Sequence, residues 1–530
     1  MPAHVSRVVF LGLDGGTMSV LTPAFERGWM PNLAALWRGS AFGTLRSSDP
    51  MVTPVAWTSF LTGCPPQVHG IHEFYYVEVA DRTIRCNHAG RVRVPNLWQI
   101  LSASGRAVVS LNLPMTYPPP RVQGIVVAGS DSPSLEWAFA QCPDFAAEVF
   151  AHIPDYTHKI VWKNRPRSLE ELRRLAERNR AIFRAQAMAA ERADARTDWS
   201  ALMVHFHNLD SLQHRLWPDL DVDDTGVRKA GWNEEVESCL RTLDESVGRL
   251  LELASSRDAA VIAVSDHGFG PCRALVNVNG LLRRAGLQRG LAYGTRFRYR
   301  AHRLTDRLHR WRSRREPGGS GRRLPRSIEG QVGCDWKRTL AFAPFGQLSG
   351  CVFLNPETTA HDALAERAMR EVIDVFQDAR DPQTGAPLFC DTFSVAERYG
   401  LDPAVTGLPE VLALSADGYQ AQAKWSPLRN DLLRPDPNLP ATHYREGIVA
   451  IHAPGIQAGD HLSADLQDIA PTTLALLGVR VPIGMEGRVL HEAFEAPLPV
   501  HYGARPVIEA DPHRDALLVA AGFGSDEDNQ

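Results

Sequence analysis

Aspartate and histidine residues that could hold metal ions recur at four places in the 530-residue sequence, each beside a short apolar run. They are Asp14 in Gly-Leu-Asp-Gly-Gly-Thr, Asp210 with His214 in Asp-Ser-Leu-Gln-His, Asp266 and His267 in Ser-Asp-His-Gly, and His443 in Ala-Thr-His-Tyr. Carboxylates and neutral imidazoles are ligands of zinc, at about 2.0–2.2 Å, and of manganese. Each cluster alone has an ordinary structural interpretation, because an aspartate after a strand is frequently a turn residue or a helix cap. The pair Asp266–His267 is the most specific, since buried charges must be paired or bound to metal.

A potential nucleophile is Thr53, in Met-Val-Thr-Pro-Val-Ala-Trp-Thr-Ser-Phe. The proline that follows it is favoured in the first turn of a helix, and the spacing of Ala56, Phe60 and Leu61 predicts a helix that begins near Thr53. Free N–H groups and the helix dipole at such an end favour an anion. The hydroxyl could attack phosphorus there if something lowered its pKa. The alternative is that Thr53 only caps the helix.

These residues need a scaffold that brings them together, and the apolar runs predict a β-sheet. Continuous Val-, Ile- and Leu-rich runs are typical of strands covered on both faces, and six are present, at residues 8–13, 107–111, 124–128, 201–206, 259–264 and 447–451. Between the fourth and fifth runs, apolar residues at three- and four-residue steps predict an amphipathic helix, at Val236, Leu240, Leu243, Val247 and Leu250. This alternation predicts a doubly wound α/β sheet, in which ligands bind at the carboxyl ends of the strands.

Composition limits the class of protein. The 57 Lys and Arg residues against 61 Asp and Glu give a net charge of −4, so no global field favours nucleic acid. No run approaches the roughly 18 apolar residues of a membrane helix, and the apolar run after residue 7 is too short for a signal peptide. The eight cysteines form no Cys-x-x-Cys pair, which favours free thiols in a reducing compartment. We therefore expect a cytoplasmic protein without a transmembrane segment; its oligomeric state is open.

Two stretches depart from the alternating pattern. Residues 130–198 include an Arg-, Glu- and Ala-rich helical stretch at 168–195, and residues 296–326 contain twelve arginines. We expect a catalytic core at 1–272 and 334–500 with an insertion around 130–198, a basic cap or insert at 273–333, and a C-terminal tail at 501–530. The arginine-rich segment is expected to be a solvated helix, with a polyanion or a membrane surface as the alternative partner.

Several motifs together resemble the alkaline phosphatase superfamily. The resemblance is strongest to its type I phosphodiesterase/nucleotide pyrophosphatase family, in the bacterial branch described as diadenosine-triphosphate-hydrolase-like. The motifs occur in the family's order from residue 8 to about 490: Leu-Gly-Leu-Asp-Gly-Gly, Thr-Pro-Val-Ala-Trp-Thr-Ser-Phe-Leu-Thr-Gly, Val-His-Gly-Ile-His-Glu-Phe, Asp-Ser-Leu-Gln-His-Arg-Leu-Trp, Ser-Asp-His-Gly-Phe-Gly-Pro and Asp-Ile-Ala-Pro-Thr-Thr-Leu-Ala-Leu-Leu-Gly-Val. The implied fold is an alkaline-phosphatase-like three-layer sandwich with a mostly parallel central sheet and inserted cap segments. Departures, at Glu486 and Ala441, touch no expected ligand.

The resemblance also implies a binuclear metal site. By position, one ion would be held by Asp210, His214 and His443, and the other by Asp14, Asp266 and His267 together with Thr53. Metal coordination would make the threonine alkoxide available near neutral pH, and paired cations would stabilise both the attacking and the leaving oxygens. The implied reaction is hydrolysis of a phosphodiester or pyrophosphate bond of a small anionic, nucleotide-type substrate through phospho-Thr53. The ions would be zinc, with manganese as the alternative.

Other functions compete with this interpretation. A phosphomonoesterase or a phosphomutase would use the same site, whereas a sulfatase needs Cys/Ser-x-Pro-x-Arg, and the run that begins at Cys64 ends in valine. From another class, the turn at 12–17 could bind phosphate in an actin-like or sugar-kinase-like ATPase, which needs a second strand directly after the glycines. A non-catalytic protein that binds an anion through the basic segment is the last alternative. Trp57 and Phe74 could line the site entrance, although a core position is favoured.

Overall fold

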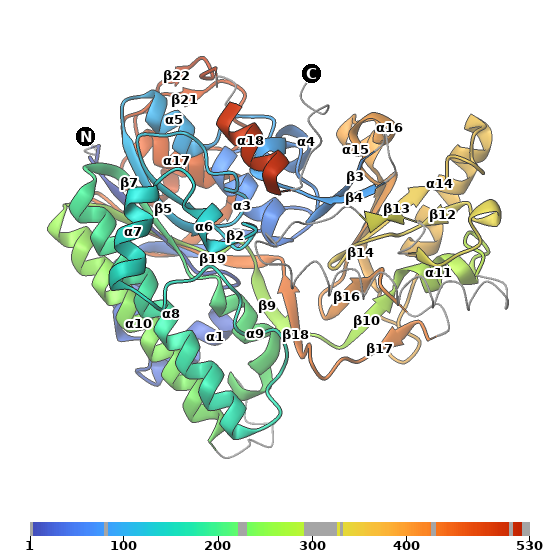
Figure 1. The fold of residues 1–530 in the computed structure, drawn as a ribbon, viewed down its shortest axis with the longest axis horizontal. Helices are drawn as coiled ribbons and strands as arrows, with labels where there is room; N and C mark the ends of the chain where they lie inside the picture. The colour runs from blue at the N-terminus through green and yellow to red at the C-terminus, as the bar shows by residue number, and fades with distance from the viewer. Residues whose placement is uncertain are drawn as a thin grey trace. The chain divides into compact units, whose positions relative to one another are not determined.

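The computed structural model describes residues 4–78, 83–220, 231–290, 326–328, 332–425, 431–507 and 512–521. The chain forms two compact units, whose elements are labelled in Figure 1. Unit 1 contains Met1–Ile71, His88–Pro271 and Pro437–Leu517, and unit 2 contains His72–Asn87, Cys272–Asp436 and Leu518–Gln530. Residues 334–436, which we expected in the core, therefore belong to unit 2, because their strands pair in separate sheets. The arginine-rich segment, apart from Arg326, and the acidic end at 524–530 lie outside the described residues.

Unit 1 is built on an eight-stranded sheet of order β20-β2-β19-β8-β1-β7-β5-β6. The strands are β1 Val8–Gly12, β2 Ala41–Arg46, β5 Ala107–Leu113, β6 Gly124–Ala128, β7 Trp199–His205, β8 Ala260–Val264, β19 Glu446–His452 and β20 Gly459–Asp465. All six predicted strands are present, with ends within two residues of the prediction. The sequence did not reveal β2 and β20, since β2 contains Gly and Thr and β20 is half polar. The sheet is mostly parallel, as expected, and β19 is the strand that runs antiparallel to its neighbours β2 and β8.

The direction of β19 decides where His443 lies. Val449 pairs with Val264 and His452 with Val261, so the start of β19 lies at the carboxyl end of β8. If β19 ran parallel to β8, a residue just before β19 would lie at the opposite edge of the sheet. His443 itself belongs to β18 (Ala441–Tyr444), which pairs antiparallel with β9 (Gly268–Pro271) and places His443 opposite Phe269.

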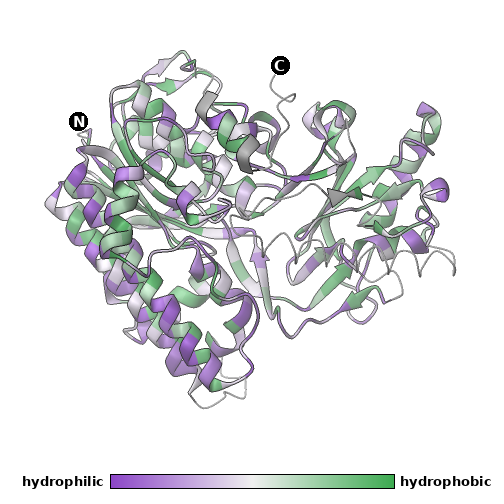
Figure 2. Ribbon diagram, in the orientation of Figure 1, coloured by the Kyte–Doolittle hydropathy of each residue, from purple (hydrophilic) through white to green (hydrophobic). Residues whose placement is uncertain are grey.

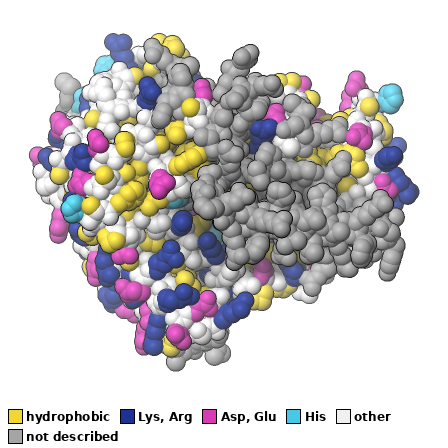
Figure 3. Space-filling view, viewed as in Figure 1, with side chains coloured by type: hydrophobic (Ala, Val, Ile, Leu, Met, Phe, Trp, Pro, Cys, Tyr) yellow, Lys and Arg dark blue, Asp and Glu magenta, His cyan; other side chains and the backbone are white. Residues whose placement is uncertain are grey.

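Helices cover both faces of the sheet (Figure 1), which gives the expected three layers. The long helices α8 (Leu169–Arg196) and α10 (Trp232–Ser256) pack along each other on one face, and every predicted apolar position of α10 is buried. Figure 2 shows these two helices alternating between hydrophilic and hydrophobic, whereas the central strands are mainly hydrophobic. Charges of both signs mingle on their outer surface (Figure 3). Two ion pairs join this part of the chain, between Arg249 and Glu191 and between Arg257 and Asp194.

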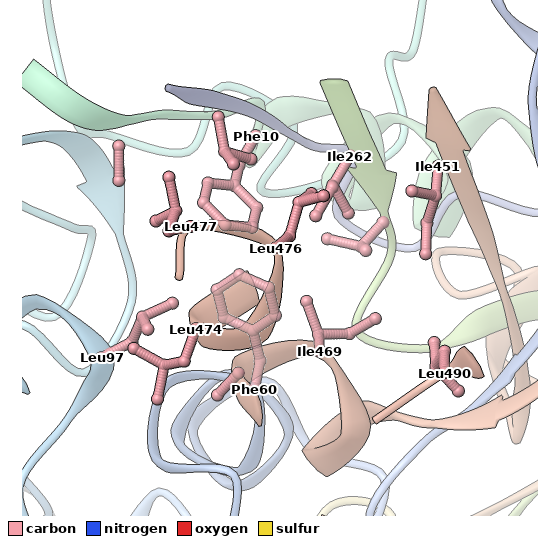
Figure 4. Close-up of a cluster of buried hydrophobic side chains, with 14 of the residues drawn as sticks. Phe10, Phe60, Leu97, Ile262, Ile451, Ile469, Leu474, Leu476, Leu477 and Leu490 are labelled. Carbon is pink, nitrogen blue, oxygen red and sulfur yellow. The ribbon is translucent and has the colours of Figure 1, made fainter. Parts of the chain in front are cut away.

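The other face carries the core of unit 1, drawn in Figure 4. Helices α3 (Thr53–Thr62), α5 (Leu97–Ala103) and α17 (Ile469–Leu476) meet the sheet there. The rings of Phe10 and Phe60 pack edge to face with their centroids 5.7 Å apart. Every residue of α3 from Pro54 to Thr62 is buried. Since close-packed interiors resist displacement, the start of α3 has a fixed position.

The remaining described helices of unit 1 connect these layers. They are α1 Met18–Glu26, α2 Pro31–Arg38, α4 Pro66–His69, α6 Leu135–Ala138, α7 Pro143–His152 and α9 Asn208–Leu220, and a short pair of strands, β21 Val481–Pro482 and β22 Tyr502–Gly503, lies near the C-terminus. The unit boundary after Leu517 falls within α18 (Pro512–Ala521). Among the described residues, no helix combines the length and the apolar character that crossing a membrane requires. All eight cysteines are free thiols.

Unit 2 consists of small sheets with helices packed against them. A four-stranded sheet has the order β12-β13-β15-β14, with β12 Ala341–Phe342, β13 Ser349–Leu354, β14 Phe389–Ser394 and β15 Val411–Ser415. Two three-stranded sheets contain β16 Tyr419–Gln422, β10 Ala274–Asn277 and β17 Leu433–Arg434, and β11 Arg326–Ser327, β4 Thr83–Cys86 and β3 Tyr75–Glu78. The helices are α11 Val278–Arg284, α14 Asp362–Gln377, α15 Val395–Tyr399 and α16 Pro403–Thr406. Helix α14 buries Ala368, Val372 and Phe376.

Unit 2 holds a buried carboxyl group, that of Glu73. Its Oε1 accepts a hydrogen bond from the Phe74 N–H at 2.8 Å, and its Oε2 lies 3.9 Å from the Cys351 sulfur. Burial raises the pKa of Glu73 from 4.5 to about 7. The folded chain thus holds this proton more tightly than the unfolded chain does. The contribution of Glu73 to stability is fully present below pH 4.5 and is lost as the pH rises through 7, by about 3 kcal/mol in total.

Ionisation of Glu73 lowers the free energy of unfolding of the parent protein between pH 4 and pH 8. We therefore expect the fall over this pH range to be about 3 kcal/mol smaller in E73Q than in the parent. Urea denaturation at both pH values measures this difference. The matched control is Glu366→Gln, because the Glu366 side chain is 62% exposed and should leave the slope unchanged. An equal pH slope in the parent and in E73Q would contradict the prediction.

Candidate metal centre

The strand ends of the central sheet place the acidic residues at one edge. Asp14 follows β1 by two residues, and Asp266 follows β8 by two residues. The ladder continues past the strands, with Leu13 N–H donating to Val264 O and Phe206 N–H to Gly12 O, each at 2.8 Å. Asp210 lies in the first turn of α9, just beyond β7, and His214 lies one turn later on that helix. These backbone bonds fix the loops from which the side chains project.

The first group of possible ligands is Asp14, Asp266 and His267, all buried, whose ligand atoms lie within 4.8 Å of one another. His267 Nε2 is 3.2 Å from Asp266 Oδ2 and 3.8 Å from Asp14 Oδ1. The other Asp266 oxygen, Oδ1, accepts a hydrogen bond from the Gly15 N–H at 3.1 Å. One oxygen of Asp266 is thus held by the backbone while the other faces the group.

The second group is formed around Asp210. Its Oδ1 lies 3.2 Å from His443 Nε2, 3.5 Å from His214 Nε2 and 4.0 Å from His267 Nε2. The two Nε2 atoms of His214 and His443 are 3.0 Å apart, and the rings of His267 and His443 stack with centroids 3.5 Å apart. His267 therefore lies between the two groups and meets both.

Backbone carbonyls determine which nitrogen each histidine offers. The Nδ1 atoms of His214, His267 and His443 lie 3.0 to 3.1 Å from the carbonyl oxygens of Ala441, Gly268 and Met51, respectively. Because a carbonyl only accepts hydrogen bonds, each Nδ1 carries the donated proton, and Nε2 is the ring atom left for the cluster. This outer hydrogen bond is the usual partner of a metal-bound histidine. All three Nε2 atoms face the cluster.

Electrostatics within the cluster favour a cation. Burial lowers the pKa of His214 to about 4 and that of His267 well below its ordinary value, so both rings are neutral at pH 7. Burial, reinforced by the neighbouring carboxylates Asp266 and Asp210, raises the pKa of Asp14 far above its usual range. Burial raises that of Asp266 to about 7, again with Asp210 adding to it. Asp210 differs, because despite its burial the neighbouring His214 and His443 lower its pKa below the ordinary value. Its charge makes the ionisation of Asp14 and Asp266 costly unless a cation joins them.

The donor atoms fit divalent metal ions. Among the described residues, four of these buried atoms have no hydrogen-bond partner: Asp14 Oδ1, Asp210 Oδ1, Asp266 Oδ2 and His267 Nε2. Buried polar atoms without partners are costly. A mixed carboxylate and imidazole donor set suits zinc or manganese. The donor atoms of the cluster therefore fit the divalent metal ions that the sequence suggests.

Thr53 stands at the start of α3. The capping alternative is wrong, because Val52 is the residue at the N-cap and no side chain caps the helix. Among the described residues, the Thr53 hydroxyl takes part in no hydrogen bond. The Met51 carbonyl, two residues earlier, is the acceptor for His443 Nδ1. The start of α3 is thus tied directly to one of the histidines.

Other expectations have clear outcomes. The ATPase alternative is wrong, since the turn at Gly15 and Gly16 leads into helix α1 rather than into a second strand. Trp57 is fully buried, as favoured, but the core position favoured for Phe74 is wrong, because its side chain is 37% exposed in unit 2. The sequence reasoning missed His205, the last residue of β7, whose Nε2 lies 2.9 Å from Asp14 Oδ2. A histidine that ends an otherwise apolar strand was the available signal.

The fold is a three-layer α/β sandwich, and aspartate and histidine residues that can bind metal gather at the carboxyl edge of its mostly parallel sheet. This is the arrangement of the alkaline phosphatase superfamily. Within it, the family model of type I phosphodiesterase / nucleotide pyrophosphatase matches residues 8–436, and the chain belongs to this family. It is accordingly a hydrolase of phosphoester or pyrophosphate bonds. No curated protein sequence matches the chain.

Solved structures share the fold. One is the phosphonoacetate hydrolase from Sinorhizobium meliloti 1021 in complex with phosphonoacetate, with a TM-score of 0.55 and 15% identity over 89% of this chain and 96% of that one. Another is human ectonucleotide pyrophosphatase / phosphodiesterase 5, with a TM-score of 0.52 and 11% identity over 92% of this chain and 100% of that one. Identities this low establish a common fold and nothing more specific.

Proposed function

We propose that this protein hydrolyses phosphodiester or pyrophosphate bonds of small, nucleotide-type substrates through a phospho-Thr53 intermediate at a site for two divalent metal ions. The observation that carries the proposal is the convergence of buried carboxylate and imidazole atoms, four of which have no hydrogen-bond partner: Asp14 Oδ1, Asp210 Oδ1, Asp266 Oδ2 and His267 Nε2. Asp210, His214 and His443 would hold one ion, and Asp14, Asp266 and His267, with Thr53, the other. Zinc is the first choice and manganese the second.

The chain itself contributes position and rigidity. Helix α3 is buried along its length, so the Thr53 hydroxyl is held at the amino end of a helix that cannot easily shift. The positive end of the helix dipole favours the anionic phosphoryl group there. The Gly15 N–H and the Ala441, Gly268 and Met51 carbonyls hold the ligating side chains in one orientation. When bound, the ions would lower the pKa of the hydroxyl and neutralise charge that develops on the phosphoryl oxygens.

Rates on three substrates test the substrate class. We expect the metal-loaded protein to cleave an activated diester and a dinucleoside polyphosphate with kcat/KM at least about 10-fold above that for an activated monoester, which corresponds to a difference of about 1.4 kcal/mol in transition-state stabilisation. Metal analysis of the same sample should give two equivalents. A faster monoester reaction would instead support the phosphatase alternative, and transfer of the phosphoryl group to a second substrate would support the mutase. No hydrolysis of any of the three would favour a non-catalytic, anion-binding protein.

A further inference from the structure

A cavity of about 380 Å³ lies within unit 1, separate from the metal centre. Its walls come from the second half of α3, the chain before and at the start of α5 (Figure 1), residues 115–120 and two residues near the C-terminus. Every described residue that lines the cavity belongs to unit 1, and none is Thr53 or one of the six expected metal ligands. Sites for small molecules have volumes of about 300–1,000 Å³. The cavity can therefore hold a small ligand.

Part of the wall is apolar and firmly held. Leu61 of α3 and Met115 are both buried, and Val92 and Val94 lie beside them in the lining. Close-packed side chains resist displacement, and proline rings fix the backbone φ. Four prolines line the cavity: Pro95, Pro118, Pro120 and Pro506. The shape of the cavity is thus set by the chain itself, and it offers a surface for the apolar body of a ligand.

The polar part of the wall offers amide donors from two side chains. Asn96 and Gln99 form the capping box of α5, in which Asn96 Oδ1 accepts from the Gln99 N–H and Gln99 Oε1 accepts from the Asn96 N–H, each at 3.0 Å. Because both oxygens are engaged, only the NH₂ groups remain for another partner. Among the described residues, neither NH₂ group takes part in a hydrogen bond. The capping box thus fixes both amides with their donors available.

Positive charge lies beside these donors. The Arg93 guanidinium lines the cavity and makes no hydrogen bond or ion pair with any described residue. Its backbone N–H donates to the His69 carbonyl at 3.1 Å, and a Cβ atom at Gly70 would lie 2.8 Å from its Nε, so the arginine stem packs directly on a glycine. Arg514 also lines the cavity, with its Nε 3.8 Å from Asp515 Oδ1. No aspartate or glutamate is among the described lining residues.

We propose that this cavity is a second binding site, which takes a small organic oxyanion with an apolar body. A carboxylate or phosphoryl head group would accept hydrogen bonds from Arg93, Asn96 and Gln99, since a guanidinium fork matches both kinds of oxyanion. The apolar body would lie against the Leu61 and Met115 side. The site goes beyond the proposed function, because neither the metal ions nor Thr53 takes part. The alternative is a gap filled with water, in which Arg93 is only solvated.

Two substitutions remove donors and keep the local structure. Arg93→Met keeps a long unbranched side chain without charge. Gln99→Glu keeps an oxygen for the capping box but replaces the NH₂ group with a negatively charged oxygen. The matched control is Arg367→Met in unit 2, where the arginine is 73% exposed and pairs with Glu371. Asp210→Asn reports whether an anion binds at the metal centre instead. The measurement is calorimetric titration of the full-length, metal-loaded protein with benzoate, phenylphosphonate and uncharged benzyl alcohol.

We expect the parent to bind benzoate or phenylphosphonate at least about 10-fold more tightly than benzyl alcohol. Arg93→Met should weaken this binding by about 10- to 100-fold, as loss of a charge-assisted hydrogen bond does, and Gln99→Glu by at least as much. Arg367→Met and Asp210→Asn should stay within about twofold of the parent.

Three results would overturn the site: no binding of either anion at millimolar concentration, parent-like affinity in both Arg93→Met and Gln99→Glu, or equal affinity for benzyl alcohol. Loss of anion binding in Asp210→Asn alone would place the anion at the metal centre and also overturn the inference. Failure of the proposed function is a different result, because it would appear as absent metal or absent turnover in the parent whatever the cavity binds.

Discussion

Replacing Thr53 with alanine should lower kcat/KM for an activated phosphodiester by at least about 10³-fold, as removal of an attacking group generally does. The reason is that no other hydroxyl is expected at the start of α3 to form the covalent intermediate. The six Asp and His side chains are unaltered, so metal content should stay near that of the parent. Rates under saturating metal, together with metal analysis of the same sample, measure both quantities.

Two matched variants make this result interpretable. Thr53→Ser keeps a hydroxyl and should retain far more activity than the alanine variant. Thr58→Ala removes a hydroxyl from the same helix, one that donates to the Pro54 carbonyl at 2.6 Å, and should leave turnover within a few-fold of the parent. Acid quenching during turnover should trap phosphothreonine in the parent and not in Thr53→Ala. Near-parent turnover in Thr53→Ala would exclude Thr53 as the nucleophile and leave the metal site untouched.

The central sheet could be predicted because burial on both faces leaves a distinct pattern. β1 and β8 are five-residue strands buried at every position, and such runs of Val, Ile and Leu rarely have another explanation. β2 lacks the pattern because only Ala41 and Leu45 are buried, and β20 alternates polar and apolar residues. Unit 2 was missed for another reason: its sheets are small and most of their strands short, although β13 and β15 are buried at every position.

The residues that can bind metal could be recognised from their types. Which of them come together in the fold could not, because that depends on strand direction and on contacts between distant residues. Asp14 and Asp266 were expected at one edge because both follow parallel strands. His443 lies there only because β19 runs antiparallel, and nothing in the residues of β19 specifies its direction. His205 escaped notice because its surroundings depend on distant backbone: its Nδ1 meets the carbonyl of Asn112, a residue 93 positions away in sequence.

Chelation of divalent metal should abolish turnover and also destabilise the fold. Without a cation, the Nε2 atoms of His214 and His443 lie 3.0 Å from each other, and buried carboxylates lie beside them. Metal that binds only the folded state stabilises it by about 2.7 kcal/mol at a concentration of 100 times Kd. We therefore expect a chelator to lower the unfolding temperature by several degrees and to reduce activity by more than about 10³-fold. Zn²⁺ or Mn²⁺ should restore both.

Measuring the metal-induced rise in unfolding temperature and the activity in variants separates residues that bind metal from the residue that attacks phosphorus. Asp210→Asn removes a carboxylate that faces His214 and His443, so it should lose most of the metal-induced rise in unfolding temperature along with its activity. Thr53→Ala should keep most of that rise although it has no turnover, because the three Asp and three His ligands remain. If the chelator changed neither turnover nor the unfolding temperature of the parent, the paired-metal site would be wrong even though the fold places its side chains together. If Thr53→Ala lost the thermal shift as completely as Asp210→Asn, Thr53 would be holding metal rather than serving mainly as the attacking group.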